Sequence, residues 1–384
     1  MTGMRFLTLL VFLTMVVPSV RAQWVIQESN TTADLRGIHN VGGGVAWASG
    51  TGGTVLRTTD DGAHWQKCAI PDAKTDGATL DFRSIQAWDD RNAYVMSSGP
   101  GEKSRLYRTT NGCKSWKLIL KNRDKDGSWV AVHFELRIFG WLLGDPVNGM
   151  FTLFTSENGG RYWIRQRNKG LRVQPGTQRV FAASNSSLIR PVMPLAVVAF
   201  GSGGSGGSFV YFGSKTEICV DDCPPEEMDL EGRKDKWDRE AVPLGHNTNA
   251  SGVFSISGRH EDACAPYRSR EEVLVAVGGD YDNPNDSSNT AAFKLAYDQP
   301  WTASANPPHG YRSSVQWSSP LKTWIAVGLN GTDVSRDDGH NWRALKPSAG
   351  EPADADRNWN ALSLPFVVGP AGRIGRLRED VLKH

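Results

Sequence analysis

The chain has 384 residues and a formal net charge of +2, which argues against a general polyanion-binding protein, and we expect no nucleic-acid partner. Its 41 Gly, 20 Pro and 14 Trp indicate many turns and hairpins backed by aromatic side chains. Long amphipathic helical patterns are absent, so the composition predicts an all-β protein.

The chain starts with the features of a secretory signal. Residues 1–5 are short and basic, residues 6–17 form an apolar run with two threonines, and Ala22 is a small residue suited to signal-peptidase cleavage. The apolar run is too short to span a bilayer comfortably, and no second run of membrane length follows. We therefore expect residues 1–22 to be a signal peptide, residues 23–384 to form the domain, and the protein to be exported to the periplasm or the cell exterior, without a membrane span. An uncleaved signal anchor is the alternative.

One eight-residue phrase recurs along the chain. It reads TTDDGAHW at 58–65 and SRDDGHNW at 335–342, has Asn for Asp at 156–163, and is loosest at 109–116. Such a phrase predicts a tight turn between two strands, in which Asp or Asn caps backbone N–H groups, Gly takes a positive φ and Trp packs beneath the turn. The residues expected to build these turns are Thr58, Asp60, Gly62, Trp65, Thr109, Asn111, Trp116, Ser156, Asn158, Gly160, Trp163, Ser335, Asp337, Gly339 and Trp342.

The spacing of these phrases sets the organisation of the chain. Their first three Trp residues recur at the period of a propeller blade. Two further units are needed before residue 335, and we expect their inner strands at 179–181 and 252–256. The C-terminal region supplies three strands and no phrase, and residues 24–27 can supply the fourth. The sequence thus predicts one all-β propeller of about seven four-stranded blades, closed by pairing of the N- and C-terminal strands.

Two segments interrupt the repeats. Residues 201–207 are rich in Gly and Ser, but strand-like residues flank them, so we expect a hairpin loop rather than a domain boundary. Residues 219–236 are charged and occupy the place where a repeated phrase is expected. This insertion either carries partner contacts or is simply solvated.

The five cysteines are an odd number for an exported protein, so at least one is unpaired within the chain. Cys68 follows the first phrase and Cys113 lies inside the second, so neighbouring repeats could bring them together. Cys219 or Cys223 could pair with Cys264. We expect no metal at Cys219 and Cys223, because two Cys without nearby His make a weak site. No cofactor is expected either.

Four arginines stand at one register of the expected inner strands: Arg36, Arg83, Arg179 and Arg312. A propeller places the starts of its inner strands around one mouth of the channel, so these guanidinium groups could form an anion-binding ring. Alternatively, each pairs with a nearby acid such as Asp34 or Asp81 and supports only its own loop. The remaining blades carry Val130, Gly252 and Asn360 at this register.

The repeated phrase resembles the Asp-box of sialidase-type (BNR) repeats, Ser/Thr-x-Asp-x-Gly-x-x-Trp. The chain from residue 23 onward is similar to β-propellers of the photosystem II stability and assembly-factor type. This resemblance implies a fold and a binding role, not a reaction. Propellers of that type carry an arginine patch used in partner binding, to which Arg36, Arg83 and Arg312 are the closest positional matches. We expect a monomeric, non-catalytic scaffold of an envelope complex, with a protein partner or an anionic ligand at the channel mouth.

A carbohydrate-active hydrolase on the same fold is the alternative. A sialidase would need an arginine triad, a tyrosine activated by an acid and a separate proton donor, but the Arg-Ile-Pro motif is absent and no Tyr follows Tyr311. Other glycosidases need only two suitably separated carboxylates, which 41 Asp and Glu residues leave open. A deep pocket with two facing carboxylates would favour the hydrolase, and a basic ring would favour the scaffold.

Overall fold

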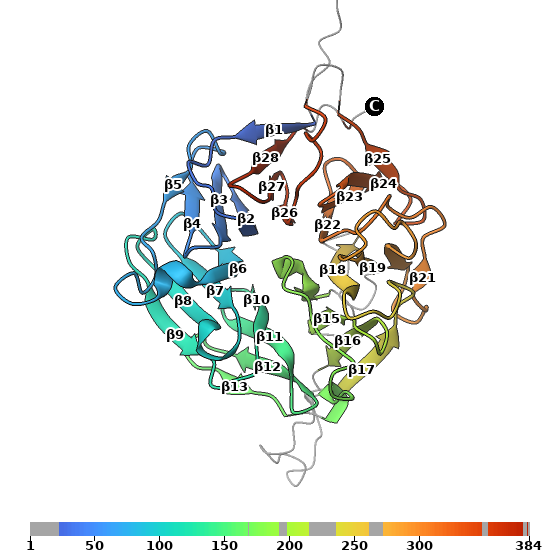
Figure 1. Ribbon diagram of the computed structural model, residues 1–384, viewed down its shortest axis with the longest axis horizontal. Coiled ribbons are helices and arrows are strands. Elements are labelled where there is room, and N and C mark those ends of the chain that lie inside the picture. Colours follow the sequence, from blue (N-terminus) through green and yellow to red (C-terminus); the bar gives the residue numbers. More distant parts are fainter. Residues whose placement is uncertain are drawn as a thin grey trace, which may run out of the picture.

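The computed structural model describes residues 23–167, 169–191, 198–214, 236–260, 272–347, 352–378 and 382. Seven four-stranded antiparallel sheets surround a common axis as the blades of a β-propeller (Figure 1). The prediction of an all-β propeller with seven four-stranded blades is confirmed. The expected signal peptide, residues 1–22, lies outside the described residues.

The strands follow one another outward from the axis in each blade. Blades 1 to 3 contain β2 (Leu35–Gly42), β3 (Val45–Gly50), β4 (Val55–Thr58) and β5 (Gln66–Lys67); β6 (Asp81–Ala87), β7 (Ala93–Ser98), β8 (Arg105–Thr109) and β9 (Lys117–Lys121); and β10 (Trp129–Glu135), β11 (Phe139–Val147), β12 (Met150–Ser156) and β13 (Ile164–Arg165). Blades 4 to 6 contain β14 (Leu188–Ile189), β15 (Val198–Ser202), β16 (Phe209–Ser214) and β17 (Lys236–Ala241); β18 (Ser251–His260), β19 (Glu272–Asp280), β20 (Ala291–Lys294) and β21 (Thr302–Ala303); and β22 (Ser314–Ser318), β23 (Thr323–Gly328), β24 (Gly331–Ser335) and β25 (Arg343–Leu345). Blade 7 contains β26 (Ala361–Ser363), β27 (Phe366–Val368), β28 (Ile374–Leu377) and β1 (Trp24–Gln27). The short 3-10 turns are η1 (Gly77–Thr79), η2 (Gly101–Lys103), η3 (Lys169–Leu171) and η4 (Asn185–Ser187), and no described helix is long and apolar enough to cross a membrane.

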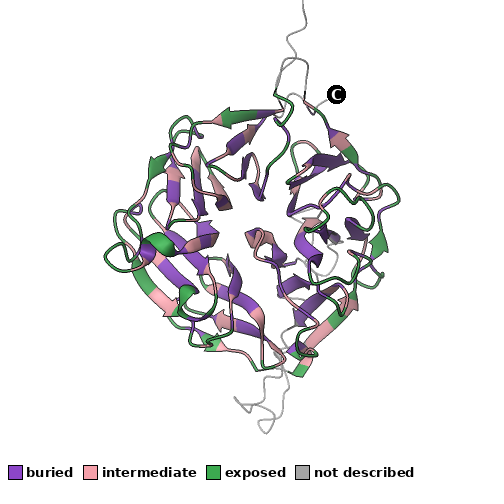
Figure 2. Ribbon diagram, viewed as in Figure 1, coloured by how far each residue is buried: buried purple, intermediate pink, exposed green. Residues whose placement is uncertain are grey.

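The core lies between the blades. Strand β23 is buried at every position, because both faces of its blade are covered by neighbouring blades. One hydrophobic cluster joins Leu35 and Leu56 of blade 1 to Phe366 and Val368 of blade 7. The exposed residues gather on the outer strands and the loops (Figure 2). Packing between adjacent blades therefore holds the ring together.

Blade 7 is built from both ends of the chain. Strand β1 pairs antiparallel with β28, with Trp24 opposite Leu377. The Trp24 side chain is 2% exposed and packs against Trp359, with ring centroids 5.8 Å apart. The prediction that the N- and C-terminal strands close the ring is confirmed, and Figure 1 shows β1 beside β28.

The four repeated phrases form the same turn, between the third and fourth strands of blades 1, 2, 3 and 6. In the first copy, the hydroxyl of Thr58 accepts the N–H of Gly62 (3.0 Å), and Oδ1 of Asp60 accepts the N–H of His64 (2.9 Å). Gly62 has a φ of 86° and Trp65 is buried. The same two bonds link Cys113 to Thr109 and Ser115 to Asn111, Gly160 to Ser156 and Tyr162 to Asn158, and Gly339 to Ser335 and Asn341 to Asp337.

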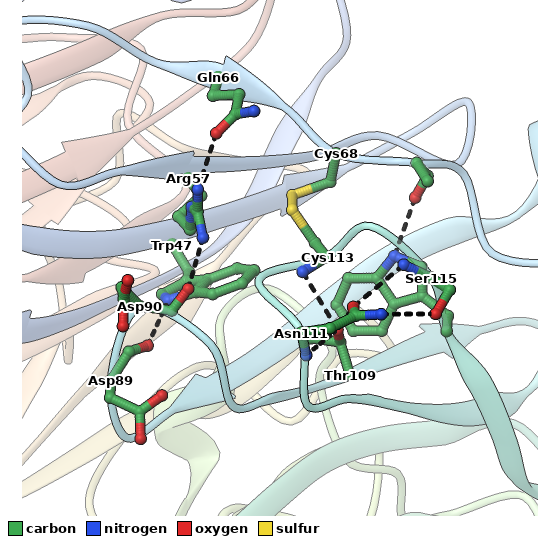
Figure 3. The surroundings of a disulfide bond; sticks show 12 residues. Trp47, Arg57, Gln66, Cys68, Asp89, Asp90, Thr109, Asn111, Cys113 and Ser115 are labelled. Atoms are coloured by element: carbon green, nitrogen blue, oxygen red, sulfur yellow. Dashed lines mark hydrogen bonds between the residues drawn. A yellow bond between two sulfur atoms is a disulfide. The ribbon is translucent and has the colours of Figure 1, made fainter.

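The second copy differs because Cys113 stands where the other copies have Gly, and it takes a φ of 57°. Cys113 forms a disulfide with Cys68, which ties the end of blade 1 to the turn of blade 2 (Figure 3). The N–H of Ala69 also donates to the carbonyl of Cys113 (3.2 Å), and the indole N–H of Trp116 donates to the carbonyl of Ala69 (2.8 Å). The other three cysteines, at positions 219, 223 and 264, lie outside the described residues.

The middle of the chain departs from the expected pattern in one place. The inner strand of blade 4 was expected at residues 179–181, and this prediction is wrong, because the paired strand is β14. Arg179 makes only an isolated bridge with Gly203. By contrast, residues 252–256 lie within β18, and residues 201–207 span the hairpin between β15 and β16. Most of the insertion at 219–236 lies outside the described residues.

Candidate functional site

A cavity of about 490 Å³ lies at the end of the channel where the inner strands begin. Six blades contribute to its wall through the first residues of their inner strands, or the residue just before. We call it the arginine cavity. Its charged lining residues are Arg36, Arg83, Arg179 and Asp145, and its aromatic lining residues are Trp129, Phe181, Phe254, Tyr281 and Tyr311.

A β-bulge places one residue of several inner strands on this wall. The pairing of the first two strands of the blade shifts between Leu35 and Gly37 in blade 1, and at the equivalent point in blades 2, 3 and 5. Such a bulge turns the extra residue out of the regular ladder. The bulged residues are Arg36, Arg83, Val130 and Phe254, and all four line the cavity.

Arg312 does not join this group, so the expected ring of four arginines is wrong at this residue. The N–H of Arg312 donates to a Gly carbonyl of the preceding blade, as do those of Leu35 and Trp359. Arg312 therefore occupies the inter-blade position of Leu35, and Ser313 occupies the cavity position of Arg36. A shift of one residue moves a strand side chain to the opposite face.

The buried position of Arg312 has its own set of polar partners. Its side chain is 0% exposed, its guanidinium pairs with Asp333, and it also bonds the side chains of Asn330 and His309. A buried charge needs such compensation. Arg312 therefore stabilises blade 6 from inside and is not available to a ligand.

Arg36 and Arg83 both line the cavity and pair with acids, so the two sequence-based alternatives coexist. Nε of Arg83 donates to Asp81 (2.7 Å) and Nη1 donates to the carbonyl of Ala182 (3.1 Å). Nη2 of Arg36 lies 3.7 Å from a carboxylate oxygen of Asp34. These side chains are 27% and 30% exposed for Arg36 and Arg83, respectively, so part of each guanidinium still faces solvent.

Arg179 completes the basic wall. Its guanidinium has no hydrogen-bond partner among the described residues. Asp145 lies near it, and burial raises the pKa of Asp145 to about 6, against the opposing effects of the Val180 N–H (3.2 Å) and of Arg179. The cavity lining therefore holds three guanidinium groups and one weakly acidic carboxyl group, while the acids paired with Arg36 and Arg83 lie outside the lining. Within the described ranges, no three His, Cys, Asp or Glu side chains gather as metal ligands.

The arginine cavity also has an aromatic, largely apolar wall. The rings of Phe181 and Phe254 are stacked, with centroids 3.9 Å apart. Tyr281 lies edge-on to both rings, at 6.3 and 6.1 Å, and Tyr311 lies edge-on to Phe254 at 4.7 Å. Sequence reasoning missed this wall. Gly252 was expected at this register in blade 5, and a shift of two residues would have placed Phe254 beside Arg36 and Arg83.

The segment 179–190 forms the floor of the arginine cavity; we call it the channel segment. Its residues 179–183 line the cavity, whereas residues 184–186 and 188–190 line a second cavity on the other side. The Asn185 side chain bonds both the N–H (3.0 Å) and the carbonyl (2.8 Å) of Val132. The Ser186 hydroxyl lies 2.7 Å from that of Ser255. These bonds hold residues 185 and 186 against β10 and β18, just before β14 begins, which agrees with the absence of an inner strand at residues 179–181.

Comparison with known proteins gives the fold. No protein-family profile matches the chain, and no curated protein matches its sequence. The structure of YCF48 from Cyanidioschyzon merolae aligns over 94% of this chain and 100% of its own, with 18% identity and a TM-score of 0.59. A structure of YCF48 bound to D1 peptide aligns over 93% of this chain and 97% of its own, with 13% identity and a TM-score of 0.55. The predicted resemblance to photosystem II assembly-factor propellers is confirmed for the fold.

Proposed function

We propose that this protein is a non-catalytic binding scaffold whose arginine cavity receives an acidic segment of a partner protein. The observation that carries the proposal is the convergence of Arg36, Arg83 and Arg179 on one cavity with an aromatic wall. Guanidinium groups bind carboxylates through a planar fork of donors, and aromatic rings bury the apolar side chains beside them. A peptide that carries an acid next to an apolar residue fits both walls.

The comparisons support a peptide as the class of ligand. The photosystem II assembly factor YCF48 shares the fold, and one of its structures contains a D1 peptide. We extend from that protein only the general role, in which a propeller holds a segment of a partner during assembly or stabilisation of a complex. We place this complex in the cell envelope, because the N-terminal sequence has the features of a secretory signal and the Cys68–Cys113 disulfide suits an oxidising compartment.

The hydrolase alternative lacks a supporting observation. Glycoside hydrolysis uses two carboxyl groups that flank the scissile bond. Among the described lining residues of the arginine cavity, Asp145 is the only carboxylate. The basic wall accordingly favours binding over hydrolysis.

The test is a double charge reversal in the cavity, Arg36→Glu with Arg179→Glu. Arg83 is left in place because it holds the carbonyl of Ala182 in the channel segment. We expect that the wild-type protein recovers a specific partner from an envelope extract, that the double variant does not, and that its melting temperature is nearly unchanged. A synthetic peptide from the acidic segment of that partner should bind the wild-type protein directly.

The matched control is Arg91→Glu with Arg343→Glu, which makes the same charge change at two exposed positions away from the cavity. This variant should recover the partner as the wild type does. If the cavity variant recovers the partner as well as the wild type does, the arginine cavity is not the binding site. Failure to recover any partner, together with hydrolysis of a glycan panel, would favour the hydrolase.

A further inference from the structure

The two halves of the channel segment have different neighbours. Residues 179–183 line the arginine cavity, whereas residues 184–186 and 188–190 line a second cavity of about 340 Å³. Asn185 and Ser186 belong to the second half and are not among the residues that line the arginine cavity. Any effect of these two residues on a ligand of the arginine cavity is therefore indirect.

Asn185 ties the channel segment to blade 3. Its side-chain amide accepts the N–H of Val132 (3.0 Å) and donates to the carbonyl of Val132 (2.8 Å). Val132 lies on the inner strand β10, two residues after Val130, which lines the arginine cavity. Asn185 thus satisfies both backbone groups of one residue at the channel edge of this strand, as a neighbouring strand would.

Ser186 ties the channel segment to blades 5 and 6. Its hydroxyl lies 2.7 Å from that of Ser255 on β18, 3.2 Å from that of Ser314 on β22, and 2.7 Å from that of Ser184. The hydroxyl of Ser184 donates to the carbonyl of Ser313 (3.0 Å). Because Ser184 uses its single proton on that carbonyl, it accepts from Ser186, which in turn accepts from its other two partners. The four hydroxyl groups form one chain of hydrogen bonds.

The residues between these anchors and Arg179 have few hydrogen bonds of their own. Arg179 makes two backbone bonds with Gly203, of 2.9 and 3.0 Å. Among the described residues, the backbone of residues 181–183 is bonded only through the carbonyl of Ala182, which accepts from Nη1 of Arg83 (3.1 Å). The position of this short stretch therefore depends on how its two ends are held.

This stretch carries a part of each wall of the arginine cavity. The ring of Phe181 stacks on that of Phe254, with centroids 3.9 Å apart, and so belongs to the aromatic wall. The carbonyl of Ala182 and the carboxylate of Asp81 together fix the orientation of the Arg83 guanidinium, which belongs to the basic wall. A displacement of the stretch would disturb both walls.

We propose that Asn185 and Ser186 are positioning residues of the arginine cavity, which hold its floor in place before a ligand arrives. This inference rests on the proposed function of the cavity. A site that is already ordered binds more tightly, because binding does not have to order it. The anchors act most directly on Phe181, which belongs to the channel segment, whereas Arg36 belongs to β2. Their loss should weaken recognition of an apolar side chain more than recognition of the acid beside it.

The test uses the whole folded protein and two acetylated and amidated peptides, Ala-Glu-Phe-Ala and Ala-Glu-Gly-Ala, which differ only in the apolar side chain. In the double variant Asn185→Ala with Ser186→Ala, calorimetry should show an affinity for the Phe peptide that is lower by at least about fivefold, and a smaller preference for it over the Gly peptide. A protein that is merely less stable would bind less of both peptides with the same preference. An unchanged preference in the double variant would overturn the proposal.

The matched control is Ser187→Ala. Ser187 lies in the same segment and is 0% exposed, but its hydroxyl has no hydrogen-bond partner in the described part of the chain. It also lines neither cavity. This variant should bind both peptides as the wild type does, and a loss equal to that of the double variant would contradict the role of the two anchors.

Hydrogen exchange without a ligand separates this inference from the proposed function. The N–H of Val180 donates to Asp145 (3.2 Å), so its exchange reports the order of the cavity floor. We expect faster exchange of this group in the double variant than in the wild type or in Ser187→Ala. Equal exchange would overturn the proposal even if the peptides bind. If the wild type binds neither peptide, the proposed function fails, and faster exchange would still support the anchoring of the floor by Asn185 and Ser186.

Discussion

The perimeter of the ring and its channel differ in what they repeat. On the perimeter, four turns keep the same two side-chain hydrogen bonds, from Thr58 in blade 1 to Ser335 in blade 6. In the channel, equivalent bulge positions carry different chemistry, such as Arg36, Val130 and Phe254. The backbone repeats in both regions, but the side chains repeat only on the perimeter. Perimeter changes should therefore alter stability, and channel changes should alter binding.

The largest expected effect is the loss of ring closure. Deletion of residues 23–29 removes β1 and uncovers Trp359, so the free energy of unfolding should fall by at least about 3 kcal/mol, as for other buried Trp losses. Thermal melting followed by circular dichroism measures this. Trp24→Ala should reproduce much of the loss, whereas Ile26→Ala, at a position 49% exposed, should be nearly neutral. An unchanged melting curve for the deletion would contradict closure by β1.

The disulfide between blades 1 and 2 comes next. Its cysteines are 45 residues apart, so a chain-entropy estimate gives about 4 kcal/mol of stabilisation. The double variant Cys68→Ser with Cys113→Ser should lose this free energy of unfolding, which guanidinium unfolding would show as a lower midpoint concentration. Each single Ser variant should be about as destabilised as the double variant, because either change breaks the bond. If the double variant is as stable as the wild type, the disulfide does not contribute to the stability of the fold.

A single repeated turn should matter less. Thr58→Ala removes the acceptor of the buried Gly62 N–H, which should cost about 1–2 kcal/mol. The neighbouring Thr59 is exposed, and Thr59→Ala is the control expected to leave stability unchanged. Ser335→Ala in blade 6 should match Thr58→Ala in urea unfolding. Different losses at the two turns would mean that the perimeter is less uniform than its hydrogen bonds indicate.

The smallest effect belongs to the channel and concerns binding. Because the pKa of Asp145 is about 6, its carboxyl is neutral below that pH and negative above it. An acidic peptide should bind the arginine cavity a few-fold more weakly as the pH rises through about 6, since ionised Asp145 then competes for Arg179. Asp145→Asn keeps an acceptor for the Val180 N–H and should remove this dependence in calorimetry. The same pH profile in both proteins would exclude Asp145 as its cause.

The fold was accessible from the sequence because its signals are local. Each repeated phrase closes one hairpin, and the apolar residues at 24–27 match the strand that blade 7 lacked. The inner strand of blade 4 was not accessible, because contacts from other blades decide it. Phe181 stacks on Phe254, and Asn185 bonds Val132 across the channel. No local pattern encodes these contacts.

The candidate site was only partly accessible. The sequence analysis placed Arg36 and Arg83 correctly because the β-bulge occurs at equivalent positions in blades 1 and 2. Arg312 was misplaced by a single residue, a shift that propensity cannot detect when Ser313 and Ser314 follow it. The signal that separates the two registers is the partner acid Asp333, which lies on β24 and reaches Arg312 only in the folded blade.

The pairing of Trp24 with Leu377 also governs when the molecule can finish folding. During synthesis, β1 emerges first and must wait for β28, while the other blades can already stack on one another. Pairing between such distant residues is slow, and the waiting strand edges are prone to associate with other chains. Ring completion is thus a late step, and agents that shield β1 in the meantime should raise the yield of folded protein.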